Sequence, residues 1–293
     1  MIRLAVRCPP EQAGLVLAEM TVLAPNGVEE ERGPGYVEYA IYGGEGELPE
    51  LGQLDAVVDG GRIEVSSTEI PDDWADRWRD FHKPLLVGDR LWLRPSWEPP
   101  RHGAVDVVVD PGQAFGTGAH PTTRLCLEFL LELADVGEAE GPLTDLGTGS
   151  GVLAIAAAKL GWDPIGAYDH EPAALDATAA NAGINGVELD LQRMNLREQL
   201  PPLAPTVVAN MTAPILKAVA GQLGEWEGSR GRARRSNSGE APPSPPPTPR
   251  TFVCSGLMPA ELDEVAAAFS ACGLAEVERR TEGDWAALLL RRP

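Results

Sequence analysis

A glycine-rich turn is the first feature of this chain that could do chemistry. The segment DLGTGSGVLAIAAAKLG, residues 145–161, places Gly147, Gly149 and Gly151 between a strand pattern and an apolar helix pattern. Glycine lets the backbone turn sharply and approach a ligand closely. We therefore expect a ligand to lie over the carboxyl end of this strand and the N-terminus of the next helix.

The glycine spacing and a later acidic residue narrow the class of ligand. The spacing is G-x-G-x-G, and Val152 stands where the dinucleotide fingerprint G-x-G-x-x-G requires glycine. Asp169 ends the next predicted strand, where its carboxylate can accept both hydroxyls of a ribose. Dinucleotide enzymes use such an acid too, and an aspartate that only caps the following helix is the structural alternative. A phosphate-binding P-loop is excluded, because no Gly-Lys-Ser/Thr follows the turn.

A second unusual segment, DPGQAFGTGAHPTT, occupies residues 110–123 and runs directly into the apolar helix pattern TTRLCLEFLLEL. Its prolines and glycines exclude a helix interior and make a poor strand. Gly116 and Gly118 supply mobility for closing a site. Thr122 and Thr123 lie beside free backbone N–H groups at the helix start, which can receive a carboxylate. His120 is either a base or the partner in a structural hydrogen bond within the loop.

Asn210 is a third candidate site residue. The segment VVANMTAP places it at the carboxyl end of the fourth strand of the predicted sheet. Its amide oxygen can accept a hydrogen bond from a ligand at that edge. A structural asparagine that finishes a strand is the alternative.

Taken together, these motifs resemble the S-adenosylmethionine-dependent methyltransferases, and more closely the ribosomal protein L11 methyltransferase family. The resemblance runs from LWLRPSW through the two segments above to VVANM and SGL, and AFGTGAHPTT is its most specific element. It implies that the loop AFGTGAHPTT, residues 114–123, folds over S-adenosylmethionine and that the Asn210 amide oxygen accepts from the incoming amine and orients its lone pair. The residues that it implies in cofactor binding are Phe115, Gly116, Thr123, Gly147, Gly149, Asp169 and Asn210. Thr148, Met211 and Thr212 depart from the family's usual residues.

The pattern of elements predicts an α/β fold with a doubly wound, seven-stranded, Rossmann-like methyltransferase sheet. From residue 104 onward, strand and helix patterns alternate, which indicates a mostly parallel sheet with helices on both faces. A closing hairpin, 275–283 with 285–292, adds an antiparallel strand. We expect a methyltransferase domain over 104–293, interrupted by a disordered insertion at 227–250. That insertion is either an inert surface loop or a basic arm.

Residues 1–70 predict a small N-terminal α+β domain that recognises the substrate. Strand patterns at 2–8, 35–43 and 62–70 alternate with helix patterns at 10–23 and 47–58, an order that fits a ferredoxin-like arrangement. A tryptophan-rich junction follows at 71–103. Trp74 and Trp78 lie four residues apart on a predicted short helix, and Trp92 and Trp97 follow on an extended segment. Such aromatic residues pack a domain junction more often than they stack on bases.

Composition limits the partners. The net charge of −20 argues against broad binding to nucleic acid or anionic membranes and suits a basic protein partner. No apolar run is long enough for a membrane span, and the first residues lack a secretory signal pattern. The four isolated cysteines favour a cytoplasmic protein without a zinc site.

We therefore expect a monomeric, cytoplasmic enzyme that methylates lysine and N-terminal α-amino groups of ribosomal protein L11. The alternatives are the same transfer onto another protein or a small amine, a cofactor-binding protein without turnover, and a nicotinamide-dependent dehydrogenase.

Overall fold

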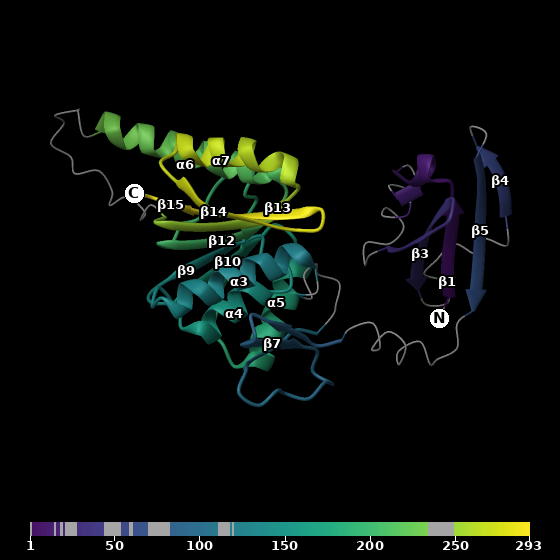
Figure 1. The fold of residues 1–293 in the computed structure, drawn as a ribbon, viewed down its shortest axis with the longest axis horizontal. Helices are drawn as coiled ribbons and strands as arrows, with labels where there is room; N and C mark the ends of the chain where they lie inside the picture. The colour runs from purple at the N-terminus through teal and green to yellow at the C-terminus, as the bar shows by residue number, and fades with distance from the viewer. Residues whose placement is uncertain are drawn as a thin grey trace. The chain divides into compact units, whose positions relative to one another are not determined.

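The computed structural model describes residues 2–14, 16, 17, 20, 28–43, 54–58, 61–69, 83–110, 118, 120–233 and 249–293. The chain divides into two compact units, Met1–His82 and Lys83–Pro293 (Figure 1). None of the described helices is long and apolar enough to cross a membrane.

The larger unit is built on a seven-stranded sheet with the strand order β11-β10-β9-β12-β13-β15-β14. The five adjacent strands β11, β10, β9, β12 and β13 are parallel to one another, whereas β15 is antiparallel to both β13 and β14. This arrangement confirms the predicted parallel sheet with a closing hairpin. The strands are β9 (Leu143–Leu146), β10 (Ile165–Asp169), β11 (Asp190–Arg193), β12 (Thr206–Asn210), β13 (Thr251–Leu257), β14 (Ala275–Glu282) and β15 (Trp285–Arg291).

Helices cover both faces of this sheet, as the alternating pattern predicts (Figure 1). Successive buried residues of one strand enter different cores: Val207 of β12 packs with α6 and α7, and Val208 packs with α3 and α4. This is the period-two alternation of a strand buried on both faces. The helices are α3 (Pro121–Asp135), α4 (Val152–Leu160), α5 (Pro172–Asn185), α6 (Ala213–Ala233) and α7 (Leu262–Ala271), the last preceded by the 3-10 turn η2 (Pro259–Glu261).

Helix α6 enters the region predicted as a disordered insertion. The helix continues to Ala233, so residues 227–233 are helical, and the prediction of disorder is wrong there. Leu216, Val219, Ala220 and Leu223 recur at helical spacing and are buried against the sheet. The first proline of the segment comes only at residue 242, so nothing earlier stops the helix. Residues 234–248 lie outside the described residues.

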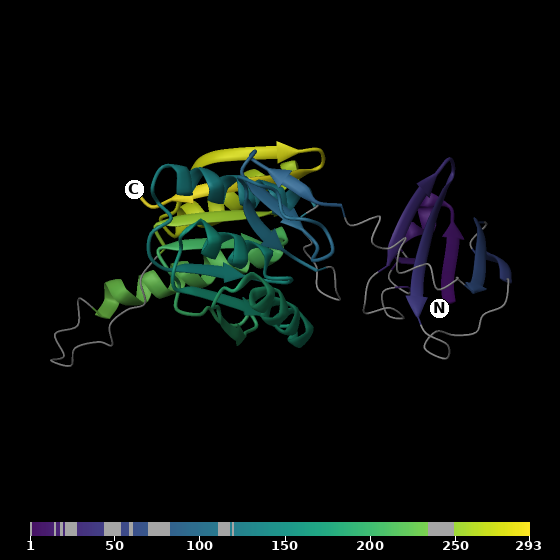
Figure 2. The ribbon, with the colours of Figure 1, turned by 90° about the horizontal axis from the view of Figure 1, so that it is seen from below.

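A three-stranded sheet of the larger unit comprises β6 (Leu85–Val87), β7 (Leu91–Arg94) and β8 (Val105–Val108). It packs against α3, α4 and α5 (Figures 1 and 2). Leu91, Leu93 and Val107 are buried in the same core as α3 and α4. Residues 83–103, predicted as part of a junction, therefore contribute to the core of the larger unit.

The predicted tryptophans of the junction fall partly within this small sheet. Trp92 donates a hydrogen bond from Nε1 to the carbonyl oxygen of Pro99 (3.1 Å), and the Arg101 guanidinium lies 5.5 Å from the centre of its ring. These contacts hold the connection between β7 and β8. Trp74 and Trp78 lie outside the described residues.

The smaller unit is a five-stranded antiparallel sheet with the order β2-β3-β1-β5-β4. Its strands are β1 (Ile2–Cys8), β2 (Glu29–Gly33), β3 (Tyr36–Gly43), β4 (Leu54–Val58) and β5 (Gly61–Glu69), and a 3-10 turn, η1, covers Pro10–Gln12. The order β2-β3-β1-β5 is that of a ferredoxin-like sheet. Leu4, Tyr39 and Ile41 pack with Val16 and Met20, which follow η1, in a separate core.

One predicted helix of the smaller unit is wrong in its described part. Residues 54–58, expected at the end of a helix over 47–58, form the edge strand β4, and residues 47–53 lie outside the described residues. Val58 pairs with Gly61, and the register continues to Leu54 opposite Val65. Backbone pairing with β5 therefore outweighed the apolar helix pattern here. Strand β2 is also absent from the predicted elements, because its sequence EEERG carries no apolar alternation.

Candidate active site

The glycine turn joins β9 to α4 in a conformation that requires its glycines. Gly147, Gly149 and Gly151 have φ angles of 75°, 56° and 82°, a region that other residues rarely adopt. The N–H groups of Gly147 and Thr148 donate to the carbonyl oxygen of Tyr168 on the neighbouring strand, at 2.8 and 3.0 Å. A Cβ atom on Gly147 would lie 3.0 Å from the Met211 side chain. The turn is therefore fixed against β10 and the end of β12.

Asp169 lies at the carboxyl end of β10 and is 8% exposed. Its Oδ2 accepts a hydrogen bond from the N–H of Gly149 (3.0 Å), and its Oδ1 accepts one from the N–H of Glu171 (3.1 Å). The second bond lies at the start of α5, as in the helix-capping alternative. The first bond joins the carboxylate to the glycine turn. Each carboxylate oxygen has further lone pairs with which to accept ligand hydroxyls.

Helix α3 begins at Pro121, and the ring of the preceding residue, His120, caps it. Nδ1 of His120 lies 2.8 Å from Oγ1 of Thr122 and accepts from the Thr122 N–H at 3.4 Å. Its ring meets that of Trp285 edge to face, with centroids 4.8 Å apart. Burial and the nearby Arg124 lower the pKa of His120, which Glu282 partly offsets. This geometry supports the structural alternative for His120 rather than a role as base.

Asn210 and Thr123 meet although 87 positions separate them in the chain. Nδ2 of Asn210 donates to Oγ1 of Thr123 at 3.2 Å, and Thr123 is 1% exposed. Among the described residues, Asn210 Oδ1 makes no hydrogen bond. The end of β12 is thus joined to the first turn of α3, with the amide oxygen available to a ligand.

The predicted residues gather at one edge of the sheet. Strands β10, β9 and β12 are adjacent and parallel, so Asp169, the glycine turn and Asn210 all follow carboxyl ends at that edge. Ligands of open α/β sheets bind at this edge, where strand order reverses. Phe115 and Gly116 lie outside the described residues. Gly118 is described and has a φ angle of 88°.

Asp145, at the base of the turn, is fully buried. Its Oδ2 accepts a hydrogen bond from the Thr148 hydroxyl at 2.8 Å. Burial nevertheless raises the pKa of Asp145 to about 7, although the Thr148 hydroxyl and the Ala154 N–H both favour the charged form. A neutral carboxyl group at this position costs less than an ionised one, because the surrounding core does not solvate charge.

Two polar residues of α5 also support the turn and are absent from the predicted site. The Thr178 hydroxyl donates to the carbonyl oxygen of Gly149 at 3.0 Å, and Asn181 Nδ2 donates to that of Ser150 at 2.8 Å. Both residues are buried. Their sequence signal is polar side chains three positions apart on an otherwise alanine-rich helix, which identifies no partner by itself.

Comparison with known proteins shows to which family this chain belongs. Residues 42–236 match the family model described as ribosomal protein L11 methyltransferase (PrmA). The chain belongs to this family. Members are S-adenosylmethionine-dependent methyltransferases, so the resemblance inferred from the motifs is confirmed and the nicotinamide alternative is wrong.

Individual members of the PrmA family agree with this assignment. A ribosomal protein L11 methyltransferase of Symbiobacterium thermophilum is 35% identical over 224 residues, which cover 76% of this chain and 66% of the relative. A ribosomal protein L11 methyltransferase of Pseudomonas fluorescens is 39% identical over 225 residues, which cover 75% of this chain and 69% of the relative. The chain thus spans about two thirds of the length of these relatives.

A solved structure also shares the fold. The crystal structure of a ribosomal protein L11 methylase from Lactobacillus delbrueckii subsp. bulgaricus is 25% identical, with a TM-score of 0.56. The match covers 72% of this chain and all of the other chain. The predicted α/β methyltransferase fold is therefore confirmed.

Proposed function

We propose that this chain transfers methyl groups from S-adenosylmethionine to lysine and N-terminal α-amino groups of ribosomal protein L11. The relatives carry this substrate in their names. The observation that carries the proposal is the Asn210–Thr123 hydrogen bond, which holds a polar amide at the edge of the sheet beside the glycine turn.

The residues present suit the proposed cofactor. Asp169 would accept the ribose hydroxyls, because its oxygens keep lone pairs beyond those taken by Gly149 and Glu171. The positive-φ glycines at 147 and 149 leave room for the adenosyl group. The N–H groups of Thr122, Thr123 and Arg124 already bond to His120, so they are not free as the sequence predicted. The Thr123 hydroxyl, at the positive end of the α3 dipole, would instead donate to the methionyl carboxylate. Phe115, Gly116 and Asn210 complete the proposed cofactor set.

The acceptor chemistry requires a neutral amine. S-adenosylmethionine supplies an electrophilic methyl group next to a positive charge. Deprotonating a lysine amine at pH 7 costs about 4.6 kcal/mol, given its ordinary pKa of about 10.4. A partly desolvated site with a nearby positive charge lowers that cost. Asn210 Oδ1 would accept a hydrogen bond from the amine and orient its lone pair, so transfer depends on positioning rather than on a strong base.

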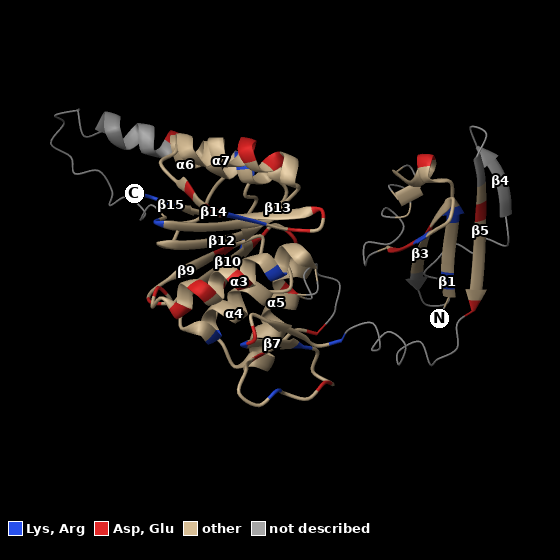
Figure 3. Ribbon diagram, in the orientation of Figure 1, with Lys and Arg blue, Asp and Glu red and all other residues tan. Residues whose placement is uncertain are grey.

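The two units would have different roles in the reaction. The N-terminal unit would recognise the protein substrate, and the larger unit would bind the cofactor and transfer the methyl group. Acidic side chains occur on elements of both units (Figure 3), which suits a basic partner. All four cysteines are buried and none is in a disulfide, which suits the reducing cytoplasm. A monomer remains the proposed state.

The test is intact-mass analysis of purified ribosomal protein L11 after incubation with this chain and S-adenosylmethionine. We expect mass gains in steps of one methyl group, and their loss in an Asp169→Ala variant. Cofactor binding by calorimetry, measured in parallel, separates the alternatives. Binding without a mass gain on L11 would redirect the search to other proteins and small amines, and no turnover on any of them would indicate a binding protein.

A further inference from the structure

One face of helix α5 contacts two segments that lie far apart in the sequence. Thr178, Asn181 and Asn185 follow one another at spacings of three and four, so they lie on the same side of the helix. Thr178 bonds only to the glycine turn among the contacts described, and Asn185 bonds to β8 and within the helix. Asn181, between them, bonds to both segments.

Asn181 uses both ends of its amide. Nδ2 donates to the carbonyl oxygen of Ser150 in the glycine turn at 2.8 Å, and Oδ1 accepts from the N–H of Asp110 at 3.2 Å. The side chain is 3% exposed. A buried amide with both ends bonded fixes the positions of its partners, because leaving either partner unbonded would cost a desolvated polar group.

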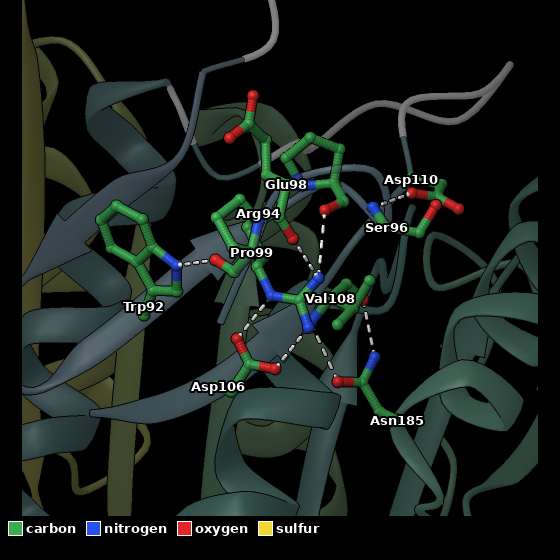
Figure 4. Close-up of polar contacts among 10 residues, drawn as sticks. Trp92, Arg94, Ser96, Glu98, Pro99, Asp106, Val108, Asp110 and Asn185 are labelled. Carbon is green, nitrogen blue, oxygen red and sulfur yellow. Dashed lines mark hydrogen bonds and ion pairs between the residues drawn. The ribbon is translucent and has the colours of Figure 1, made fainter. Parts of the chain in front are cut away.

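The β8 side of this connection is itself held by a polar cluster (Figure 4). Asn185 exchanges two hydrogen bonds with the backbone of Val108, at 2.9 and 2.6 Å. The Asp110 carboxylate accepts from the N–H of Ser96 at 2.6 Å. Arg94 is bidentate to Asp106, with both distances 2.7 Å, and also donates to the Glu98 carbonyl oxygen at 2.6 Å. The Val108 backbone is therefore held by α5, and the Asp110 carboxylate is held by Ser96, which follows β7.

We propose that Asn181 is a positioning residue that couples the glycine turn to Asp110, two residues after the end of β8. Asp110 is also the first residue of the motif that continues to Thr123. By holding the Ser150 carbonyl, Asn181 orients the turn whose Gly149 N–H bonds to Asp169. Cofactor binding at the turn would therefore slow hydrogen exchange at the Asp110 amide. This inference rests on the proposed function.

The test compares Asn181→Ala with variants of Thr178 and Asn185. Each of these two variants leaves both hydrogen bonds of the Asn181 side chain in place. Thr178→Val removes a bond to the turn only, and Asn185→Ala removes bonds to β8 and within the helix. For each variant of the full chain, calorimetry gives the Kd of S-adenosylhomocysteine, and hydrogen exchange reports the Val108 and Asp110 amides with and without this ligand. Methyl transfer gives KM for S-adenosylmethionine and kcat.

In the wild type, we expect S-adenosylhomocysteine to slow exchange at the Asp110 amide. Asn181→Ala should abolish this effect and raise both the ligand Kd and the cofactor KM about tenfold, with kcat within about threefold. Thr178→Val should weaken binding but keep the ligand's effect at Asp110. Asn185→Ala should speed exchange at Val108 and leave the Kd within about threefold.

Asn181→Asp supplies a second variant if Asn181→Ala does not fold. Its carboxylate keeps an acceptor for the Asp110 N–H but has no donor for Ser150, so it should weaken binding while Asp110 stays protected. If the Asn181 variants keep the wild-type Kd and the ligand still slows exchange at the Asp110 amide, the inference about Asn181 is wrong and the proposed function is unaffected. A wild type that binds neither S-adenosylmethionine nor S-adenosylhomocysteine would overturn the proposed function and the inference with it.

Discussion

Asp169 combines two tasks at the residue scale, because one carboxylate both closes the glycine turn and faces the proposed ribose position. In Asp169→Asn the charge and one acceptor oxygen are lost, so one of the N–H groups of Gly149 and Glu171 loses its partner. Hydrogen bonds to charged groups contribute about 1.5–3 kcal/mol each. We expect calorimetry to give a Kd for S-adenosylmethionine about 10 to 100 times higher.

The matched control is Asp176→Asn, which changes an exposed aspartate of α5 in the same way. It should leave the Kd unchanged. Equal effects of the two substitutions would mean that charge in general, rather than the Asp169 contacts, governs binding.

Asn210 belongs to the proposed cofactor set, but we expect its removal to lower the rate of methyl transfer much more than cofactor affinity. Asn210→Ala removes the proposed acceptor contact together with the bond to Thr123. Misplacement of a reacting group by about 1 Å can cost about 100-fold in rate, so kcat should fall by about that factor while the Kd for S-adenosylmethionine changes less than about threefold. Single-turnover kinetics and calorimetry separate the two. A large loss of cofactor affinity with normal kcat would contradict the acceptor role.

Asp145 predicts a pH dependence of stability. Its pKa is about 7 in the folded chain and about 3.9 when unfolded. Between these values the folded chain holds a proton that the unfolded chain has lost, so the free energy of unfolding falls as pH rises through this window, by about 1.4 kcal/mol per pH unit. Asp145→Asn lacks this titration.

Urea unfolding at pH 5 and pH 8 checks this prediction. The difference in the free energy of unfolding between wild type and Asp145→Asn should shift against the wild type by about 2–3 kcal/mol from pH 5 to pH 8. A parallel pH dependence of the two proteins would show that Asp145 ionises normally.

At the scale of elements, the join between β12 and β13 depends on a close backbone approach. Gly256 has a φ angle of 86°, and a Cβ atom there would lie 2.6 Å from the Met211 carbonyl oxygen. Neither the backbone conformation nor the contact tolerates a side chain. We expect Gly256→Ala to lower the free energy of unfolding by about 2 kcal/mol or more, measured in urea.

Gly183→Ala is the contrasting substitution. This exposed glycine lies within α5, and a Cβ atom there would have nothing within 4 Å. Alanine should raise the free energy of unfolding by about 0.5–1 kcal/mol, because glycine is the poorer helix former. If both substitutions lower the free energy of unfolding, the loss in Gly256→Ala is not explained by the backbone conformation and close contact at residue 256.

At the scale of the whole molecule, each unit has its own core. Among the residues that the structure describes, the buried clusters of the larger unit consist of residues after 82, and that of the smaller unit consists of residues before 83. Independent cores are the property that allows domains to fold separately. We therefore expect the 83–293 fragment to fold and to bind S-adenosylmethionine within about threefold of the full chain.

The same fragment tests the division of work between the units. If the smaller unit recognises the substrate, methylation of ribosomal protein L11 should fall at least tenfold in kcat/KM, a loss of about 1.4 kcal/mol. Intact-mass time courses measure this directly. Full activity of the fragment would place substrate recognition in the larger unit.

Local sequence signals determined much of this protein. The glycine spacing, the alternation of strands and helices, and the position of Asn210 can each be read from neighbouring residues. In the structure the strands form the predicted sheet, and the glycine turn and Asn210 lie at its carboxyl edge. Motif resemblance also gave the family correctly. The α5 support of the glycine turn could not be predicted, because Asn181 lies 31 positions from Ser150 and 71 from Asp110.

Tertiary structure decided the features in which pairing over distance outweighs local preference. Residues 54–58 became strand β4 because β5 offers backbone partners, whereas their own pattern fits a helix equally well. Residues 83–103 joined the larger unit because Leu91 and Leu93 find buried partners on α3 and α4. Local patterns fix where the chain turns and which side chains are apolar, but only packing selects which distant segments satisfy them.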